Sequence, residues 1–246
     1  MRRLLPGLFW QKGALSIPLE KGDVLVVAGE PRTISTLVLI GKAKLKGVRV
    51  IWWGHYWSAT SRSWRAAIRF SLMRVPDALL FYTDQEVAEF RSRCAGCSTA
   101  QHIHGLNNGI ATAEIAHLRK PYDLATRERD LFFIGRITAK AELDVLVNAL
   151  ARTNSTGFTL DVIGDGEASS QLKARAETLG LTNRVTWHGA IADEARIAQI
   201  ANSCKVFIYP GSVGLSLIHG LAYGLPAVVH DNRWRQMPEI AAHRPD

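Results

Sequence analysis

The sequence predicts an α/β protein with two Rossmann-like domains, each built around a parallel sheet. The first observation is that apolar runs rich in β-branched and aromatic residues alternate with stretches of helical spacing along most of the chain. The second is that a polar segment, residues 111–128, interrupts this alternation, which then restarts. With 246 residues, of which 47% are hydrophobic, the chain can form two cores. We therefore expect a first domain over residues 1–110, a linker over 111–128 and a second domain over 129–246.

Four strands and three helices are expected in the first domain, after a stretch of unclear structure over residues 1–22. The strands are predicted over four apolar runs: Asp23–Ala28, Val48–Trp53, Ala78–Tyr82 and His102–Leu106. The helices are predicted over Ile34–Leu45, Ser61–Arg74 and Asp84–Arg93, and Thr83 or Asp84 is suited to begin the last of them.

Five strands and four helices are expected in the second domain. The strands are predicted over Leu131–Gly135, Phe158–Gly164, Arg184–His188, Lys205–Tyr209 and Ala227–His230. The helices are predicted over Ala141–Ala151, Ser169–Leu179, Asp193–Asn202 and Gly214–Tyr223, with Asp193 as a cap. If the strands take the common order 3-2-1-4-5, the strands ending at Gly135 and Tyr209 are neighbours. Their connections then leave in opposite directions and open a crevice at the carboxyl ends.

The stretch from Val206 to His230 contains no Lys, Arg, Asp or Glu, so a membrane span has to be considered. Prolines and glycines interrupt it, which favours a strand, a loop, a helix and a second strand instead. A glycine-containing loop that leads into a helix leaves free N–H groups at Ser212–Leu215, where an anion such as phosphate is favoured. An ordinary βαβ turn that binds nothing is the alternative.

Two cations strengthen the case for an anion site. Arg136 and Lys140 follow the strand that ends at Gly135, so the assumed strand order brings both side chains to the same crevice as the helix that begins at Gly214. Two cations and a helix N-terminus at one point are typical of a diphosphate site.

The charge of the chain is uneven. The formal net charge is +8, and residues 1–128 hold 18 Lys and Arg against 10 Asp and Glu, whereas the two counts are equal beyond that point. A basic half suggests an anionic partner. The predicted helix Ser61–Arg74 interleaves four arginines with aromatic and aliphatic residues, which suits peripheral contact with an anionic membrane, although a helix packed on the sheet explains the same pattern. No nucleic-acid-binding motif is present.

Cysteine usage and the N-terminus give weaker indications. Cys94 and Cys97 lack the second cysteine pair that a zinc site needs, so we expect no metal and two reduced loop cysteines. The N-terminal apolar stretch is short and broken by Pro6-Gly7, so no signal peptide is predicted. A cytoplasmic protein, peripheral on the inner membrane face, is the resulting expectation.

The segment GLSLIHGLAYGLPAVV, which begins at Gly214, resembles the signature of retaining, nucleotide-sugar-dependent glycosyltransferases with the GT-B fold (family four, glycosyl transferases group 1 type). In that family a loop glutamate and a helix glutamate stand eight residues apart. Here Gly211 and His219 occupy the two positions. The family also has further elements before Asp23 and after Asp246, so the chain reads as truncated at both ends or as a short member.

Other segments extend the resemblance. Gly135-Arg136 with Lys140 resembles the family segment whose cations hold the donor diphosphate, and Trp53-Gly54-His55 resembles the strand end whose histidine approaches the donor sugar. His55 is also compatible with a loop histidine without a role. The resemblance implies catalytic roles for His55, Arg136 and Lys140, and no metal. It implies substrate binding at a larger set of positions: Gly135, Gly164, Asp165, Gly189, Gly211, Ser212, Val213, Gly214, Leu215, Ser216 and His219.

These features together predict a glycosyltransferase. It would transfer a sugar from a nucleoside-diphosphate sugar, with retention and without a cofactor, to an unidentified lipid-linked or glycan acceptor in cell-surface polysaccharide or glycolipid synthesis. A nucleotide-sugar-binding protein with weak or no turnover is the first alternative, because both signature glutamates are missing. A sugar-nucleotide epimerase of the same fold is the second.

Overall fold

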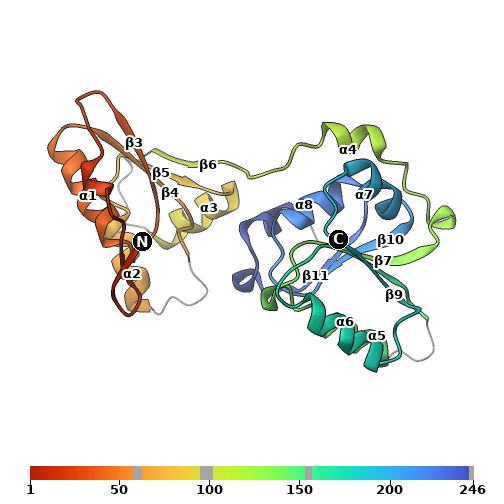
Figure 1. Cartoon of the computed structure of the whole chain (residues 1–246). Coiled ribbons are helices and arrows are strands. Elements are labelled where there is room, and N and C mark those ends of the chain that lie inside the picture. Colours follow the sequence, from red (N-terminus) through yellow and green to blue (C-terminus); the bar gives the residue numbers. More distant parts are fainter. Residues whose placement is uncertain (58–62, 95–101, 153–156, 244–246) are drawn as a thin grey trace. The chain divides into compact units, whose positions relative to one another are not determined.

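The computed structural model describes residues 1–57, 63–94, 102–152 and 157–243. The chain divides into two compact units, Met1–Asn107 and Asn108–Asp246, and each unit has its own parallel sheet (Figure 1). The expected α/β class is therefore confirmed. Within the described ranges, no helix is long and apolar enough to cross a membrane.

The sheet of the first unit has four parallel strands in chain order: β3 (Val24–Ala28), β4 (Arg49–Trp53), β5 (Ala78–Phe81) and β6 (His102–Gly105). Helices α1 (Ile34–Leu45), α2 (Ser63–Leu72) and α3 (Asp84–Arg93) connect them. Thr83 caps α3, since its side chain accepts a hydrogen bond from the Glu86 amide at 3.2 Å. Because the four strands are parallel, their carboxyl ends lie at one edge of the sheet.

The N-terminal stretch forms a hairpin that periodicity did not indicate. Strands β1 (Arg2–Leu5) and β2 (Leu8–Trp10) pair antiparallel through a turn at Pro6-Gly7. The hairpin joins the first unit at the start of α1, where the Gln11 amide donates to the Ser35 hydroxyl at 2.9 Å. Such short strands carry too few residues for a clear alternation of polar and apolar side chains.

The sheet of the second unit has five parallel strands in the order β11-β10-β7-β8-β9, which is the 3-2-1-4-5 order assumed in the sequence analysis. The strands are β7 (Arg129–Ile134), β8 (Leu160–Ile163), β9 (Val185–Gly189), β10 (Cys204–Tyr209) and β11 (Ala227–Val229). The helices are α4 (Ala113–Leu118), α5 (Leu143–Arg152), α6 (Ser169–Thr178), α7 (Glu194–Ala201) and α8 (Leu215–Ala222). Figure 1 shows α5 and α6 on one side of this sheet and α7 and α8 on the other.

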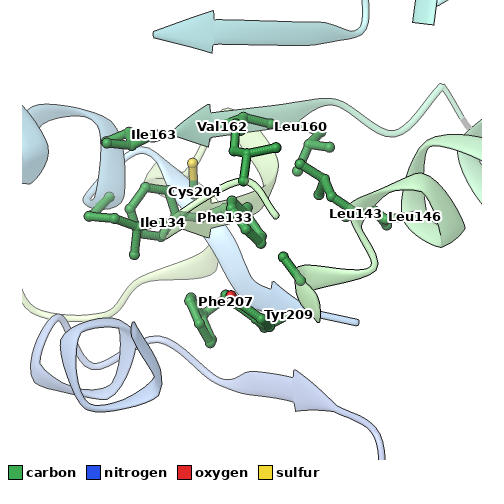
Figure 2. Close-up of a cluster of buried hydrophobic side chains, with 14 of the residues drawn as sticks. Phe133, Ile134, Leu143, Leu146, Leu160, Val162, Ile163, Cys204, Phe207 and Tyr209 are labelled. Carbon is green, nitrogen blue, oxygen red and sulfur yellow. The ribbon is translucent and has the colours of Figure 1, made fainter. Parts of the chain in front are cut away.

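The core of the second unit lies where α5 packs on the sheet (Figure 2). Phe133 of β7 stacks on Tyr209 of β10, with ring centroids 4.8 Å apart, and both side chains are buried. Leu143 and Leu146 of α5 are buried in the same cluster. Burying a large apolar side chain contributes about 1.5–3 kcal/mol to the stability of the fold, so this packing helps to hold β7 and β10 side by side.

The segment expected to be a linker is structured. Residues 111–128 contain α4 and a short 3-10 helix, and α4 packs against α7. Asn202 ties the two together, because its amide nitrogen donates to the Leu118 carbonyl at 3.0 Å and its amide oxygen accepts from the Lys120 amide at 3.1 Å. Six residues are too few for α4 to show helical periodicity in the sequence.

Two expectations need correction. The helix predicted from Ala141 begins at Leu143, because Glu142 has a left-handed backbone (φ 50°) that separates a 3-10 turn from α5. Cys94 is disulfide-bonded, so the expectation of a reduced cysteine is wrong there. Cys97 lies outside the described residues.

Candidate functional site

Three glycines, which expose their backbone, line the carboxyl edge of the second sheet. Gly135, Gly164 and Gly189 follow or end β7, β8 and β9, and all three have positive φ angles of 155°, 140° and 73°. The Gly164 amide donates to the Gly189 carbonyl at 2.8 Å, and the Gly135 amide donates to the Ile163 carbonyl at 3.0 Å. A Cβ on Gly164 would lie 1.9 Å from the Gly135 carbonyl oxygen, so only glycine fits there without a shift.

Helix α8 begins directly against this glycine edge. A Cβ on Gly135 would lie 2.8 Å from the Ser216 hydroxyl, which places the first turn of α8 beside the end of β7. The loop before α8 is held by Lys140, whose carbonyl accepts from the Ser212 amide at 2.9 Å. A Cβ on Gly211 would lie 2.1 Å from the same carbonyl oxygen, so the loop follows the backbone around Lys140 closely.

The amides that remain free at the start of α8 differ from those expected. The expectation is wrong for Ser212, whose amide bonds to Lys140, and for Val213, whose amide donates to the Gln236 side chain at 2.8 Å. The Val213 carbonyl also accepts from the Met237 amide at 3.2 Å, and its side chain is buried. For Gly214, Leu215 and Ser216 no acceptor is found in the part of the chain that the structure describes. These three N–H groups form the open end of the α8 dipole.

Arg136 and Lys140 both lie at this edge with exposed side chains. Arg136 follows Gly135 directly, and Lys140 lies in the 3-10 helix Ala139–Ala141. Within the described ranges neither cation has a carboxylate within ion-pair distance. Their charges are therefore available to an anion that approaches the α8 N-terminus.

Asp165 shapes the turn beside the crevice. Its exposed carboxylate accepts from the Gly166 amide at 2.7 Å, and its carbonyl accepts from the Ile137 amide at 3.0 Å. The turn after β8 is thus fixed to the turn after β7. This contact gives Asp165 a structural role at the position that the resemblance assigns to substrate binding.

His219 lies one turn into α8 and contacts α7. Its Nε2 is 2.8 Å from Oε1 of Glu194, and the Tyr223 hydroxyl donates to the same oxygen. Its ring also stacks on Tyr223 at a centroid distance of 5.7 Å. Burial, followed by the hydrogen bond to Glu194, raises the pKa of Tyr223 far above its usual range, so its proton stays on the hydroxyl. Glu194 therefore places a carboxylate next to the position where the family has a glutamate.

His55 lies at the carboxyl edge of the first sheet. Its Nδ1 is 3.3 Å from Oε1 of buried Glu86, whose other oxygen accepts from the Tyr82 amide at 3.0 Å. The His55 ring packs against Tyr82 with centroids 4.3 Å apart and the two planes tilted by 36°. A buried carboxylate thus orients an imidazole that is 37% exposed.

The sequence analysis did not identify three residues that position the candidate site residues: Glu86, Glu194 and Gln236. Glu86 was detectable in part, since Thr83 and Glu86 have capping-box spacing at the start of α3. Glu194 follows the predicted cap Asp193 but carries no signal that pairs it with His219. Gln236 lies 23 residues beyond Val213 in the chain, and nothing in the local sequence indicates their hydrogen bond.

Two α/β units, each with a parallel sheet, have the architecture of the GT-B fold, and the solved structures that match this chain share it. Residues 114–244, more than half of the chain, match the family model described as Glycosyl transferases group 1. The chain belongs to this family.

Comparison with individual proteins agrees with this assignment. A glycogen synthase of Alkalilimnicola ehrlichii is 30% identical over 159 residues, which cover 52% of this chain and 33% of that protein. Among solved structures, the apo form of the lipopolysaccharide outer core galactosyltransferase WaaB matches with a TM-score of 0.60 and 19% identity, over 84% of this chain and 56% of that one. The pneumococcal O-GlcNAc transferase GtfA, solved with UDP and GlcNAc, matches with a TM-score of 0.61 and 17% identity, over 89% and 44%. Anabaena Alr3699/HepE, solved with UDP, matches with a TM-score of 0.58 and 19% identity, over 84% and 59%. The chain thus spans between a third and three fifths of the length of these relatives.

Proposed function

We propose that the chain binds a nucleoside diphosphate at the crevice of the second unit and transfers a sugar from a nucleoside-diphosphate sugar to an acceptor, with retention. The observation that carries this proposal is the meeting of two cations, Arg136 and Lys140, with three amides of α8 on a glycine edge, all without a partner among the residues that the structure describes. Amides and cations that are already oriented stabilise the charge that develops on a diphosphate leaving group.

Each residue at the edge takes a defined part in this proposal. Arg136 and Lys140 neutralise the diphosphate, and the amides of Gly214, Leu215 and Ser216 hydrogen-bond its oxygens. Because Gly135, Gly164 and Gly189 have no side chains, the diphosphate can approach the backbone. For His55, at the edge of the first sheet, we separately propose contact with a sugar through Nε2, since Nδ1 faces Glu86.

The two departures from the family signature have different consequences. Position 211 accepts no side chain without movement of the loop, because a Cβ there would meet the Lys140 carbonyl. At position 219 the histidine has a carboxylate partner, Glu194. We propose that this pair takes the place of the helix glutamate at the ribose, with His219 donating or accepting one hydrogen bond.

Replacing His219 by Ala is therefore expected to weaken binding of the best nucleoside diphosphate by about 1 kcal/mol, roughly fivefold. His219→Gln, which keeps hydrogen-bonding groups, is expected to lose less. Isothermal titration calorimetry on the full chain checks both, with unfolding curves to confirm equal stability. Wild-type affinity in both variants would show that His219 is only a packed helix residue.

The proposed function is tested by a thermal-shift screen of the full chain against UDP, GDP, ADP and their sugars. UDP is the first probe, because HepE and GtfA were solved with it. A ligand at 100 times its dissociation constant adds about 2.7 kcal/mol of stability, which is readily measured. Donor consumption in the presence of an acceptor extract then reports transfer.

The two alternatives differ in their products. Binding of a nucleotide sugar without transfer or slow hydrolysis indicates a binding protein. Conversion of the donor into an epimer without an acceptor indicates an epimerase. Failure of every nucleotide to bind would remove the basis of the proposed function.

We further propose that the first unit contacts an anionic membrane surface through α2. Phe70 of this helix packs on Phe90, with ring centroids 5.7 Å apart, so one face of α2 is used internally. Trp64 and Ile68, one turn apart, are nevertheless 56% and 50% exposed. The Arg65 guanidinium lies 5.2 Å from the Trp64 ring centroid, which combines a cation with an interfacial aromatic.

Binding to phosphatidylglycerol vesicles is accordingly expected to exceed binding to phosphatidylcholine vesicles and to fall as salt rises. Trp64→Ala should reduce the bound fraction, whereas Trp234→Ala in the second unit should not. Vesicle sedimentation measures this. Equal sedimentation with both lipids would leave α2 as a helix that only packs on its unit.

A further inference from the structure

The two histidines of β6 lie side by side on one face of the first sheet. His102 and His104 are separated by one residue, and successive side chains of a strand point to opposite faces. Both histidines therefore project from the same face, and both are exposed. Their ring centroids are 6.4 Å apart, and the two ring planes are only 8° from parallel. The strand thus presents two imidazoles together to solvent.

The two imidazoles point away from the core of the first unit. Ile103, which stands between them in the chain, packs against the buried core cluster of this unit. Because side chains alternate along the strand, His102 and His104 lie on the opposite face. In the register of β5 and β6, Ala78 is the partner of His102 and Leu80 is the partner of His104. These apolar neighbours offer no side-chain group that could hydrogen-bond to the rings.

The ring nitrogens of this pair differ from those of the other histidines already described. His55, His188 and His219 each have a ring nitrogen within 3.3 Å of a carboxylate oxygen. His102 and His104 have neither a hydrogen-bond partner nor an ion-pair partner within the described ranges, and their ring contact is with each other. Their nitrogen lone pairs are therefore available to a ligand from solvent.

Two available imidazoles on one strand face match the chemistry of a transition-metal ion. Imidazole nitrogen is a preferred ligand of Zn²⁺, Ni²⁺ and Cu²⁺, whereas Mg²⁺ and Ca²⁺ prefer oxygen ligands. Zinc binds imidazole nitrogen at about 2.0–2.1 Å, which sets the centroids of two rings in a tetrahedral site about 5 Å apart. The side chains of His102 and His104 can close the distance from 6.4 Å by rotation about their own χ bonds, because both are exposed.

We propose that His102 and His104 bind one divalent transition-metal ion, for which Zn²⁺ is the probe. Groups of three or more His, Cys, Asp or Glu side chains that could hold a metal are absent from the described residues. The chain therefore contributes two ligands, and water fills the other coordination positions. The site is independent of the proposed transfer reaction, since both ligands come from one strand of the first unit. The cysteine pattern argued against a metal, but it does not bear on this histidine pair.

A metal ion at this pair stabilises the first unit. The extended strand is what places both rings on one face, so the ion binds the folded chain in preference to the unfolded chain. Zn²⁺ should therefore raise the melting temperature of the wild type, and Mg²⁺ at the same concentration should not.

The test is isothermal titration calorimetry of the nucleotide-free full chain with zinc, nickel and magnesium chloride in a buffer that binds no metal. We expect one Zn²⁺ per chain, a similar site for Ni²⁺ and no binding of Mg²⁺. His102→Thr and His104→Thr should each weaken Zn²⁺ binding on the order of tenfold or more, since one of the two protein ligands is lost. Threonine suits an exposed strand position, so both variants should fold. His117→Ala, which removes an exposed histidine of α4, is the control and should bind Zn²⁺ like the wild type.

Placement of the ion is checked by NMR, in which paramagnetic Ni²⁺ should broaden the amide signals of β5 and β6 first. Wild-type Zn²⁺ affinity in both threonine variants would overturn the site, and so would equally tight binding of Mg²⁺. One ion per two chains, with a doubled mass in solution, would also overturn it, because the ligands would then come from two copies. UDP binding tests the proposed function separately: if UDP fails to bind and Zn²⁺ binds through His104, only the transfer reaction is lost.

Discussion

Replacing Arg136 by Ala is expected to weaken nucleoside-diphosphate binding by about 10- to 100-fold, because a hydrogen bond to a charged group contributes roughly 1.5–3 kcal/mol. Arg136 is exposed, follows the glycine that contacts the start of α8, and has no carboxylate partner in the described ranges. The Arg136 charge therefore forms no ion pair that would stabilise the fold. Arg136→Ala should lower the affinity for the nucleotide and leave the free energy of unfolding unchanged. Calorimetry with the best nucleotide from the screen measures it.

Matched variants show whether the effect is specific. Arg136→Lys keeps the charge but loses the planar guanidinium, so it should bind with intermediate affinity. Arg152→Ala removes an exposed arginine at the far end of α5 and should leave affinity unchanged. Lys140→Ala should resemble Arg136→Ala. Unchanged affinity in both Arg136→Ala and Lys140→Ala would place the diphosphate in a different part of the molecule.

Replacing Gly164 by Ala is expected to destabilise the second unit by about 3 kcal/mol or more. Its Cβ would overlap the Gly135 carbonyl oxygen at 1.9 Å, and φ of 140° is unfavourable for any residue with a side chain. Because backbone cannot rotate away as a side chain does, β7 and β8 would have to separate at their carboxyl ends. Hydrogen exchange at the β7 and β8 amides reports on this unit alone.

Gly189→Ala supplies the control. Gly189 also has a positive φ, 73°, but a Cβ there would meet nothing within 4 Å. The left-handed backbone alone costs about 1–2 kcal/mol, so Gly189→Ala should be the milder variant. Equal destabilisation by the two substitutions would mean that the contact between Gly164 and Gly135 does not limit the fold.

Local sequence patterns were sufficient for most of the secondary structure. The predicted bounds of α1 and α3 agree with the structure, and the second sheet is parallel, as the alternation of strands and helices predicts. Such elements depend on the spacing of neighbouring side chains, which the sequence contains in full. The short elements β1, β2 and α4 were not predicted, because they have too few residues to show a period in the sequence.

The candidate site was predictable as a place but not as a set of contacts. Arg136 and the start of α8 could be brought together because strand order alone joins the ends of β7 and β10. Which amides of the α8 loop stay free could not be predicted, since the answer depends on Lys140 and on Gln236, 23 residues further along the chain.

The sequence by itself determined the α/β class and the succession of strands and helices, because these follow from periodicity. The strand order of the second sheet, and with it the crevice, was assumed from the common arrangement and is shown by the structure. Only the tertiary structure decided that Glu194 joins His219 across 25 residues and that Glu86 joins His55 across 31. The same holds for Trp53 and Tyr82, whose rings meet because β4 and β5 pair in a particular register. Side-chain partners distant in the chain are set by register and helix packing, which local sequence patterns do not specify.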